Sequence, residues 1–125
     1  MTLTHDGGTI IAVKVLIYRK IKPGKEKELS EAVRELRSKA IHAPGYISGE
    51  TLRSIEDPSV HLVISTWKSI EDWNAWFNTS ERKAFQEKMD VILQEPTKIA
   101  PYEYESFPVN ADETLSSLEF SVEDE

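Results

Sequence analysis

The chain has 125 residues, which is enough for one domain with a buried core. It contains no cysteine, which excludes a disulfide framework, a thiolate metal site and a cysteine nucleophile. Its formal net charge is -7, and because a nucleic-acid-binding face needs a surplus of basic residues, we expect no nucleic acid as a partner.

The two ends of the chain differ from its middle. Residues 108–125 hold six acids and no lysine or arginine, which predicts a mobile acidic tail. We interpret residues 1–9 as a flexible leader and expect a single domain over residues 10–107. Because no apolar run is long enough to cross a membrane and the leader lacks the features of a signal peptide, we expect a cytoplasmic protein without a membrane partner.

The first predicted element is a strand over residues 10–21, where the side chains alternate in character. One face of this strand is expected to point into the core, and it carries Ile11, Val13, Val15, Ile17, Arg19 and Ile21. The other face carries Leu16 and Tyr18, which a face exposed to water would not be expected to hold.

An amphipathic helix is predicted next, over residues 25–41, and Ala43-Pro44-Gly45 ends it. Its apolar stripe consists of Leu29, Ala32, Val33, Leu36 and Ala40. Two strands follow, over residues 46–56 and 60–67, and a turn at Asp57-Pro58-Ser59 joins them. Strands joined this tightly are expected to be antiparallel.

All three tryptophans of the chain, Trp67, Trp73 and Trp76, lie around the start of the next predicted helix. Ser69 is its predicted N-cap, with Asp72 at the third helical position. Large aromatic side chains on one helical face either fill a core or cover a ligand pocket. We therefore expect this helix to serve at least one of these purposes.

A second turn signal, Asn78-Thr79-Ser80, predicts a new helix that ends at Glu95-Pro96. Its expected inward residues are Ala84, Phe85, Met89 and Ile92. The last predicted element is a strand over residues 98–107, and Pro101 within it indicates an edge position.

The order of these elements is strand, helix, strand, strand, helical pair, strand. It predicts an α+β fold, the ferredoxin-like split βαβ sandwich, in which a four-stranded antiparallel sheet carries helices on one face. Leu16 and Tyr18 would then face solvent, and such an apolar patch normally marks an interface. We therefore expect a homodimer formed by packing two sheets face to face.

Several short motifs follow one another in this sequence. They are Pro23-Gly24, Ala43-Pro44-Gly45-Tyr46, the Asp57-Pro58 hairpin and Trp67-Lys-Ser-Ile-Glu-Asp-Trp-Asn-Ala-Trp. In order and spacing they resemble the antibiotic biosynthesis monooxygenase (ABM) family of dimeric α/β barrels, over residues 10–107. The resemblance implies a small aromatic molecule as partner and several chemistries: some members are cofactor-independent oxygenases of polycyclic phenols or hydroquinones, and others degrade haem.

Haem degradation is disfavoured by two positions. Haem-degrading members use an Asn on the first strand, a Trp on the short helix and a His on the next helix. The resemblance places Trp76 at the tryptophan position, but it places Ile17 and Met89 where the Asn and the His would be. An axial ligand is therefore missing at that place.

Oxygenation without a cofactor requires a site that binds an aromatic ring, deprotonates it and excludes water, because an electron-rich phenolate can itself reduce dioxygen. The expected pocket wall consists of Trp73, Trp76, Phe85 and Met89. His42 and His61 are the candidate catalytic bases. Candidate hydrogen-bonding or charge-stabilising groups are Tyr46, Tyr18 and Arg19.

Each candidate also has a structural explanation. The tryptophans and Met89 can be core residues, His42 can cap a helix end, and His61 can be exposed or at the dimer interface. The histidines lack metal-ligand spacing, so no metal site is predicted. Three functions stay open: a cofactor-independent monooxygenase of aromatic, phenolic or quinol substrates, which we favour, a non-catalytic binding or regulatory module, and a haem-degrading protein.

Overall fold

The computed structural model of the protein describes residues 12–105, so the predicted leader and acidic tail lie outside the described residues. The elements are β1 (Val13–Lys20), α1 (Glu26–Ala40), β2 (Tyr46–Arg53), β3 (Val60–Trp67), α2 (Ile70–Phe77), α3 (Ser80–Ile92) and β4 (Lys98–Glu103). This order confirms the one predicted from the sequence.

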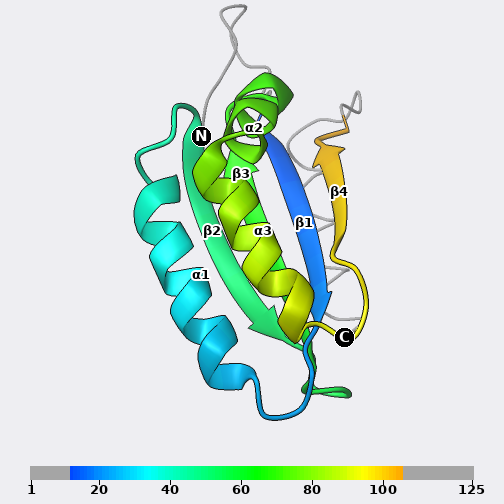
Figure 1. The fold of residues 1–125 in the computed structure, drawn as a ribbon. Helices are drawn as coiled ribbons and strands as arrows, with labels where there is room; N and C mark the ends of the chain where they lie inside the picture. The colour runs from blue at the N-terminus through cyan, green and yellow to red at the C-terminus, as the bar shows by residue number, and fades with distance from the viewer. Residues whose placement is uncertain (1–11, 106–125) are drawn as a thin grey trace, which may run out of the picture.

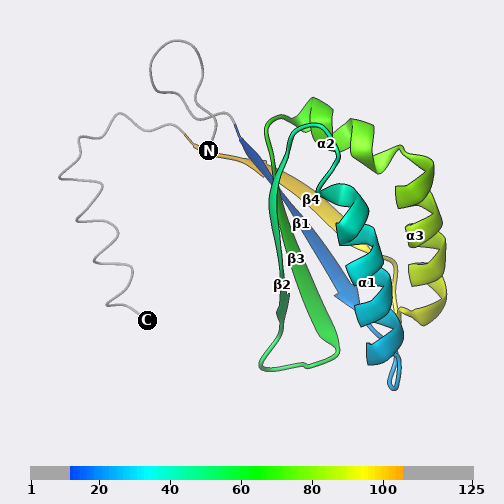
Figure 2. The ribbon, with the colours of Figure 1, turned by 90° about the vertical axis from the view of Figure 1, so that its left-hand side faces the viewer.

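The four strands form one antiparallel sheet in the order β2-β3-β1-β4. All three helices cover the same face of this sheet (Figures 1 and 2). The predicted ferredoxin-like α+β fold is thereby confirmed. β4 lies at the edge of the sheet, where Pro101 is tolerated opposite Val15 because an edge strand has one side without a ladder.

Three predicted strands are longer than the observed ones. β1 spans Val13–Lys20 and not residues 10–21, of which residues 10 and 11 lie outside the described residues. β2 ends at Arg53 and not at residue 56, because residues 54–59 form the hairpin turn. β4 ends at Glu103, and residues 106 and 107 of the predicted strand lie outside the described residues.

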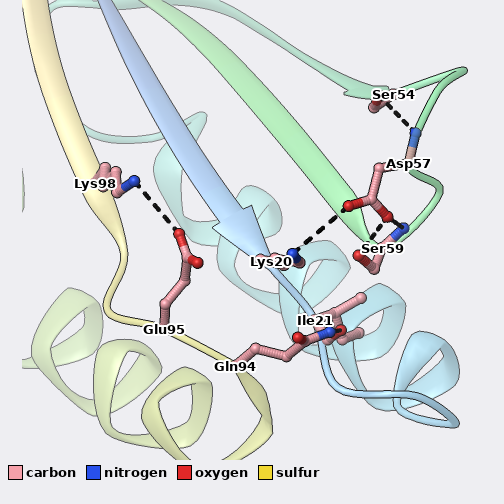
Figure 3. A network of polar contacts seen from close by, with 8 residues as sticks. All are labelled: Lys20, Ile21, Ser54, Asp57, Ser59, Gln94, Glu95 and Lys98. Carbon is pink, nitrogen blue, oxygen red and sulfur yellow. Dashed lines mark hydrogen bonds and ion pairs between the residues drawn. The ribbon is translucent and has the colours of Figure 1, made fainter.

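The hairpin between β2 and β3 is closed by Asp57 (Figure 3). Its carboxylate accepts hydrogen bonds from the backbone N–H of Ser59 at 3.1 Å and from the Ser59 hydroxyl at 2.6 Å. Its own N–H donates to the Ser54 hydroxyl at 3.1 Å. The bonds from Ser59 lower the pKa of Asp57 below its ordinary value. Near this end of β1, the Gln94 amide donates to the carbonyl of Ile21 at 2.8 Å, which joins the chain after α3 to the sheet.

Side-chain caps fix the start of the two helices that follow β3. The Ser69 hydroxyl accepts from the backbone N–H of Asp72 at 3.1 Å and donates to the Asp72 carboxylate at 3.0 Å, which confirms the predicted cap. The Thr79 hydroxyl accepts from the backbone N–H of Arg82 at 3.2 Å. Each such cap stabilises its helix by about 1 kcal/mol. Together they set where α2 and α3 begin, and therefore which residues face the sheet.

Gly45 forms the turn between α1 and β2 and adopts a φ of 84°, in the left-handed region that favours glycine. Its carbonyl accepts a hydrogen bond from the backbone N–H of Lys68 at 2.8 Å. A Cβ at this position would overlap the carboxylate of Asp72. Only glycine therefore lets this turn lie against the first turn of α2.

Two apolar clusters fill the space between the sheet and the helices. The first consists of Val13, Val15, Ile17, Ala40, Trp67, Trp73 and Trp76. The second consists of Ile21, Leu29, Phe85, Met89, Ile92 and Leu93. The predicted inward face of β1 is confirmed for Val13, Val15, Ile17, Arg19 and Ile21, whereas Ile11 lies outside the described residues. One inward position on α3 was wrong, because Ala84 is exposed and Arg82 is buried in its place.

The other face of the sheet is not covered by any helix within residues 12–105 (Figure 2). It carries a set of apolar side chains that we call the outer apolar face: Leu16, Tyr18, Leu52, Leu62, Ile64 and Tyr102. The register pairs Leu16 with Ile64 and Tyr18 with Leu62 at its centre. Homodimer formation through this face stays a prediction.

Candidate functional site

A cavity lies between the sheet and the helices, with side chains of β1, β2 and β3 on one side and of α1, α2 and α3 on the other. Its volume is about 60 Å³, below the roughly 300–1,000 Å³ typical of small-molecule pockets, so the cavity is narrow.

Five aromatic side chains line this cavity, which we call the aromatic pocket: Tyr46, Trp67, Trp73, Trp76 and Phe85. The ring of Trp67 lies 5.3 Å from that of Tyr46, edge to face, and 6.3 Å from that of Trp76, stacked. Its indole N–H donates to the Ser65 hydroxyl at 3.0 Å, which fixes the ring. The tryptophans therefore belong to the core and also line the pocket, so the two explanations left open by the sequence are compatible.

Arg19 places a cation in this pocket. Its side chain is only 3% exposed, and its guanidinium carbon lies 4.9 Å from the centre of the Phe85 ring. The Nε atom of Arg19 is buried and has no hydrogen-bond partner among the described residues. No acid within residues 12–105 forms an ion pair with it. Arg19 is therefore a buried charge that the described part of the protein does not neutralise.

Arg82 is a second buried cation in the pocket, and sequence reasoning missed it. It is 1% exposed, and its guanidinium carbon lies 5.3 Å from the Phe85 ring centre. Its Nη1 donates to the Gln86 side chain at 3.1 Å, whereas Nη2 is buried without a partner among residues 12–105. The signal was present in the sequence, because Arg82 shares the helical stripe of Phe85 and Met89.

Both buried arginines remain cations at neutral pH. Burial, and then the nearby Arg82, lower the pKa of Arg19 to about 9. Burial lowers the pKa of Arg82 to about 10. A buried charge without a partner is costly, and two like charges near each other add to that cost. An anionic group in the pocket would reduce this energetic cost by pairing with the two cations.

His61 lies directly opposite Arg19 in the register between β1 and β3. It faces the helices and is partly buried, so the expectation that it is exposed or at the dimer interface was wrong. Its Nε2 is buried without a hydrogen-bond partner among the described residues. Burial, followed by the charges of Arg53 and Arg19, lowers the pKa of His61 below 6.5, while Glu26 acts in the opposite direction. The imidazole is therefore neutral at pH 7 and can accept a proton.

A second cavity adjoins the aromatic pocket, and we call it the polar cavity. Its volume is about 360 Å³, larger than that of the aromatic pocket. It is lined by Arg19, Glu26, Leu29, Ser30, Val33, Arg34, Arg37, Thr51 and His61. Three of these residues, Arg19, Val33 and Arg37, also line the aromatic pocket. The two spaces are therefore neighbours that share Arg19, with the aromatic rings on one side and His61 on the other.

Three predicted site residues lie away from the aromatic pocket. Tyr18 points to the outer apolar face, because it alternates with the inward residues of β1. Met89 is buried in the second apolar cluster and does not line the pocket. His42 is exposed after the end of α1 and lines a separate cavity on the other side of Trp76, together with Asp72 and Glu81.

Within residues 12–105, no group of three or more His, Asp or Glu side chains is arranged to hold a metal ion. None of the helices in this part of the chain is long and apolar enough to cross a membrane.

Comparison with protein families gives a match over most of the described chain. The family model named "Antibiotic biosynthesis monooxygenase" matches residues 12–88. This stretch contains every residue named above as lining the aromatic pocket and the polar cavity.

Two curated relatives come from Streptomyces. Protein SchA of Streptomyces halstedii is 30% identical over 69 residues, which are 55% of this chain and 18% of that protein. The 42.8 kDa protein in the whiE locus of Streptomyces coelicolor is 29% identical over 84 residues, which are 62% of this chain and 21% of that protein. The matched segment spans only about a fifth of the length of each relative.

Solved structures share the fold. A conserved protein from Methanosarcina mazei Go1 superposes with a TM-score of 0.73 at 19% identity, over 77% of this chain and 95% of that chain. A candidate antibiotic biosynthesis monooxygenase from Nitrosomonas europaea superposes with a TM-score of 0.70 at 22% identity, over 79% of this chain and 94% of that chain. At such identities the likeness shows the fold alone.

Proposed function

Because the chain belongs to the antibiotic biosynthesis monooxygenase family, we propose that it is a cofactor-independent monooxygenase of small phenolic or quinol aromatic compounds. One observation carries the proposal: the un-neutralised cation of Arg19 lies in a pocket lined by aromatic rings. Such a pocket suits an aromatic substrate that becomes an anion when it loses a proton.

The substrate ring occupies the narrow aromatic pocket in this proposal. Trp76 and Trp73 from α2 and Phe85 from α3 form its helical wall, and Tyr46 and Trp67 close it on the side of the sheet. Aromatic rings stabilise one another by about 0.5–1.5 kcal/mol per pair beyond the area they bury. Water is excluded from the space that the ring fills, and this protects a reactive intermediate.

His61 is the base that we propose. It lines the polar cavity beside Arg19, its Nε2 has no partner within residues 12–105, and its lowered pKa keeps it neutral at pH 7. It accepts the phenolic proton, and the guanidinium of Arg19 stabilises the phenolate that forms. His42 lacks these features, since it is exposed and lines a different cavity.

The phenolate supplies the electrons that dioxygen accepts. A ring CH₂ group conjugated with the phenolate becomes a carbonyl group: one oxygen atom enters it, and the other leaves as water with the two hydrogens of the CH₂ group. The carbon loses four electrons and dioxygen gains four, so the reaction balances without a flavin or a metal. Arg19 and Arg82 stabilise the negative charge as it passes to oxygen.

A homodimer and a cytoplasmic location are part of this proposal. The outer apolar face packs against the same face of a second copy, as expected for an uncovered apolar sheet. Leu52 and Tyr102 support this assignment, because they are 45% and 57% exposed in the single chain.

Dioxygen uptake by the purified, metal-free protein tests the proposal, with polycyclic phenols that carry a ring CH₂ group, such as 1,8-dihydroxyanthrone, as substrates and heat-denatured protein as the blank. We expect uptake above the blank without added flavin, metal or haem. We expect His61→Gln to abolish most of this uptake and the matched variant His42→Gln to retain it.

Two other outcomes would point to the alternative functions. Binding of ring compounds without any uptake would contradict the proposal and indicate a non-catalytic binding module. A Soret band on titration with hemin, followed by haem breakdown, would indicate a haem-degrading protein in spite of Ile17 and Met89.

A further inference from the structure

The arginines of this acidic chain gather around two adjoining cavities. All five lie within residues 12–105: Arg19, Arg34, Arg37, Arg53 and Arg82. Four of them line the aromatic pocket, the polar cavity or both. The fifth, Arg53, is the cross-strand neighbour of His61, which lines the polar cavity.

Within residues 12–105 no arginine forms an ion pair, because all five ion pairs there use lysines. Among the same residues, Glu26 is the one carboxylate that lines the polar cavity. The guanidinium group binds planar oxyanions through two parallel hydrogen bonds, which an ammonium group cannot do. The arrangement is therefore suited to an oxyanion that comes from outside the described part of the chain.

Arg37 and Arg19 are the two arginines shared by both cavities. The Nη2 atom of Arg37 donates to the hydroxyl of Thr51 at 2.9 Å, which holds this side chain of α1 against β2. A hydroxyl is a neutral partner, so the charge of Arg37 remains available. Arg19 is 3% exposed, and its Nε atom has no hydrogen-bond partner among residues 12–105. A buried cation therefore lies beside Arg37 where the aromatic pocket meets the polar cavity.

We propose that the ligand of this site is an aromatic carboxylate, with its rings in the aromatic pocket and its carboxylate between Arg19 and Arg37 at the boundary with the polar cavity. The inference rests on the proposed function for the position of the rings and names the class of substrate. The two cavities share Arg19, Val33 and Arg37, so the anionic group is close to the ring. A planar carboxylate fits a narrow space better than a tetrahedral phosphate.

Isothermal titration calorimetry under nitrogen tests this inference with three probes: 6-hydroxy-2-naphthoate, its methyl ester and 2-naphthol. We expect the acid to bind at least about tenfold more tightly than the ester, because hydrogen bonds from a guanidinium to a carboxylate are stronger than those to a neutral ester. Naphthyl phosphate is the probe for the tetrahedral alternative, and we expect it to bind more weakly than the acid.

Arg37→Gln removes the boundary cation, and Lys27→Gln is its matched control. Both residues are exposed on α1, but Lys27 lines neither of the two cavities. We expect Arg37→Gln to abolish most of the preference for the acid over the ester, and Lys27→Gln to retain it. Equal affinities for acid and ester in the unaltered protein, an equal effect of the two substitutions, or tighter binding of the phosphate would overturn the inference.

The outcome is separable from that of the proposed function. Because the titration is anaerobic, it measures binding and not turnover. Selective binding of the acid without dioxygen uptake would contradict the monooxygenase and leave the carboxylate site standing. Dioxygen uptake with neutral phenols, together with equal affinities for acid and ester, would support the monooxygenase and overturn the carboxylate site.

Discussion

Arg19 and His61 lie directly opposite each other on β1 and β3, both on the face of the sheet that the helices cover. Burial disfavours the protonated form of the imidazole most, and the charges of Arg53 and Arg19 act in the same direction. The pair therefore combines a neutral base with a fixed positive charge beneath the helices.

Arg19→Met is expected to stabilise the protein while removing its activity. The substitution replaces an un-neutralised buried cation with an apolar side chain of similar length, so we expect the free energy of unfolding to rise by about 1–2 kcal/mol. Turnover should fall by about 100-fold or more, because the phenolate loses its counter-charge. Urea denaturation and dioxygen uptake measure the two effects. A large loss of stability would indicate that Arg19 is needed for the fold.

His61 makes the stability depend on pH. Its pKa in the folded protein is below 6.5, the value expected in the unfolded chain, so the unfolded chain binds more protons as the pH falls below 7. The free energy of unfolding is therefore highest, with respect to His61, above pH 6.5. It decreases as the pH falls from 6.5 to the lower pKa of His61 in the folded protein. Burial is the main cause of this lowered pKa, the charges of Arg53 and Arg19 add to it, and Glu26 opposes it. Urea denaturation between pH 7.5 and 5 should show a steeper loss for the unaltered protein than for His61→Gln, and identical slopes would refute this.

Trp76→Phe separates a ligand contact from core packing. Trp76 is 7% exposed on α2 and lines the aromatic pocket, and a phenyl ring in its place removes part of the stacking surface. We expect affinity for a ring compound to fall by about fivefold or more, with a change of only a few degrees in the melting temperature. Met89→Ala is the comparison, because Met89 is 1% exposed in the second apolar cluster and does not line the pocket, so its loss should mainly lower the melting temperature. Equal losses of both quantities in Trp76→Phe would assign it to the core.

Ile64→Glu tests the homodimer. Ile64 lies opposite Leu16 at the centre of the outer apolar face, and a carboxylate there cannot be buried without a partner. Light scattering after gel filtration should show a dimer for the unaltered protein and a monomer for this variant. Ile55→Glu is the matched control, because Ile55 is 98% exposed in the hairpin turn and should leave the dimer intact. A monomer in the unaltered protein would refute the proposed interface.

Local patterns in the sequence were enough to predict the fold. The alternation along residues 10–21 predicted both faces of β1, and Ser69 with Asp72 predicted the start of α2. These features depend on neighbours along the chain, so a single sequence contains them. The end of β2 was placed too late because the bond from Asp57 to Ser54 extends the turn into the predicted strand.

The site was harder to predict, because its chemistry depends on contacts between distant segments. Arg82 was missed because only apolar residues were counted on the inward stripe of α3, although its position has the right spacing. The environment of His61 follows from the register of β3 against β1, which places it opposite Arg19. Strand register between segments more than 40 residues apart cannot be read from either segment alone.

The turn at Gly45 constrains the evolution of the protein although it touches no proposed ligand. Any side chain there would displace the side chain of Asp72, which is hydrogen-bonded to Ser69, the N-cap of the helix that carries Trp73 and Trp76. Homologous sequences that keep this pocket should therefore keep glycine at this position, whatever compound they bind. A deep mutational scan should accordingly find position 45 as intolerant of substitution as the residues that surround the ligand.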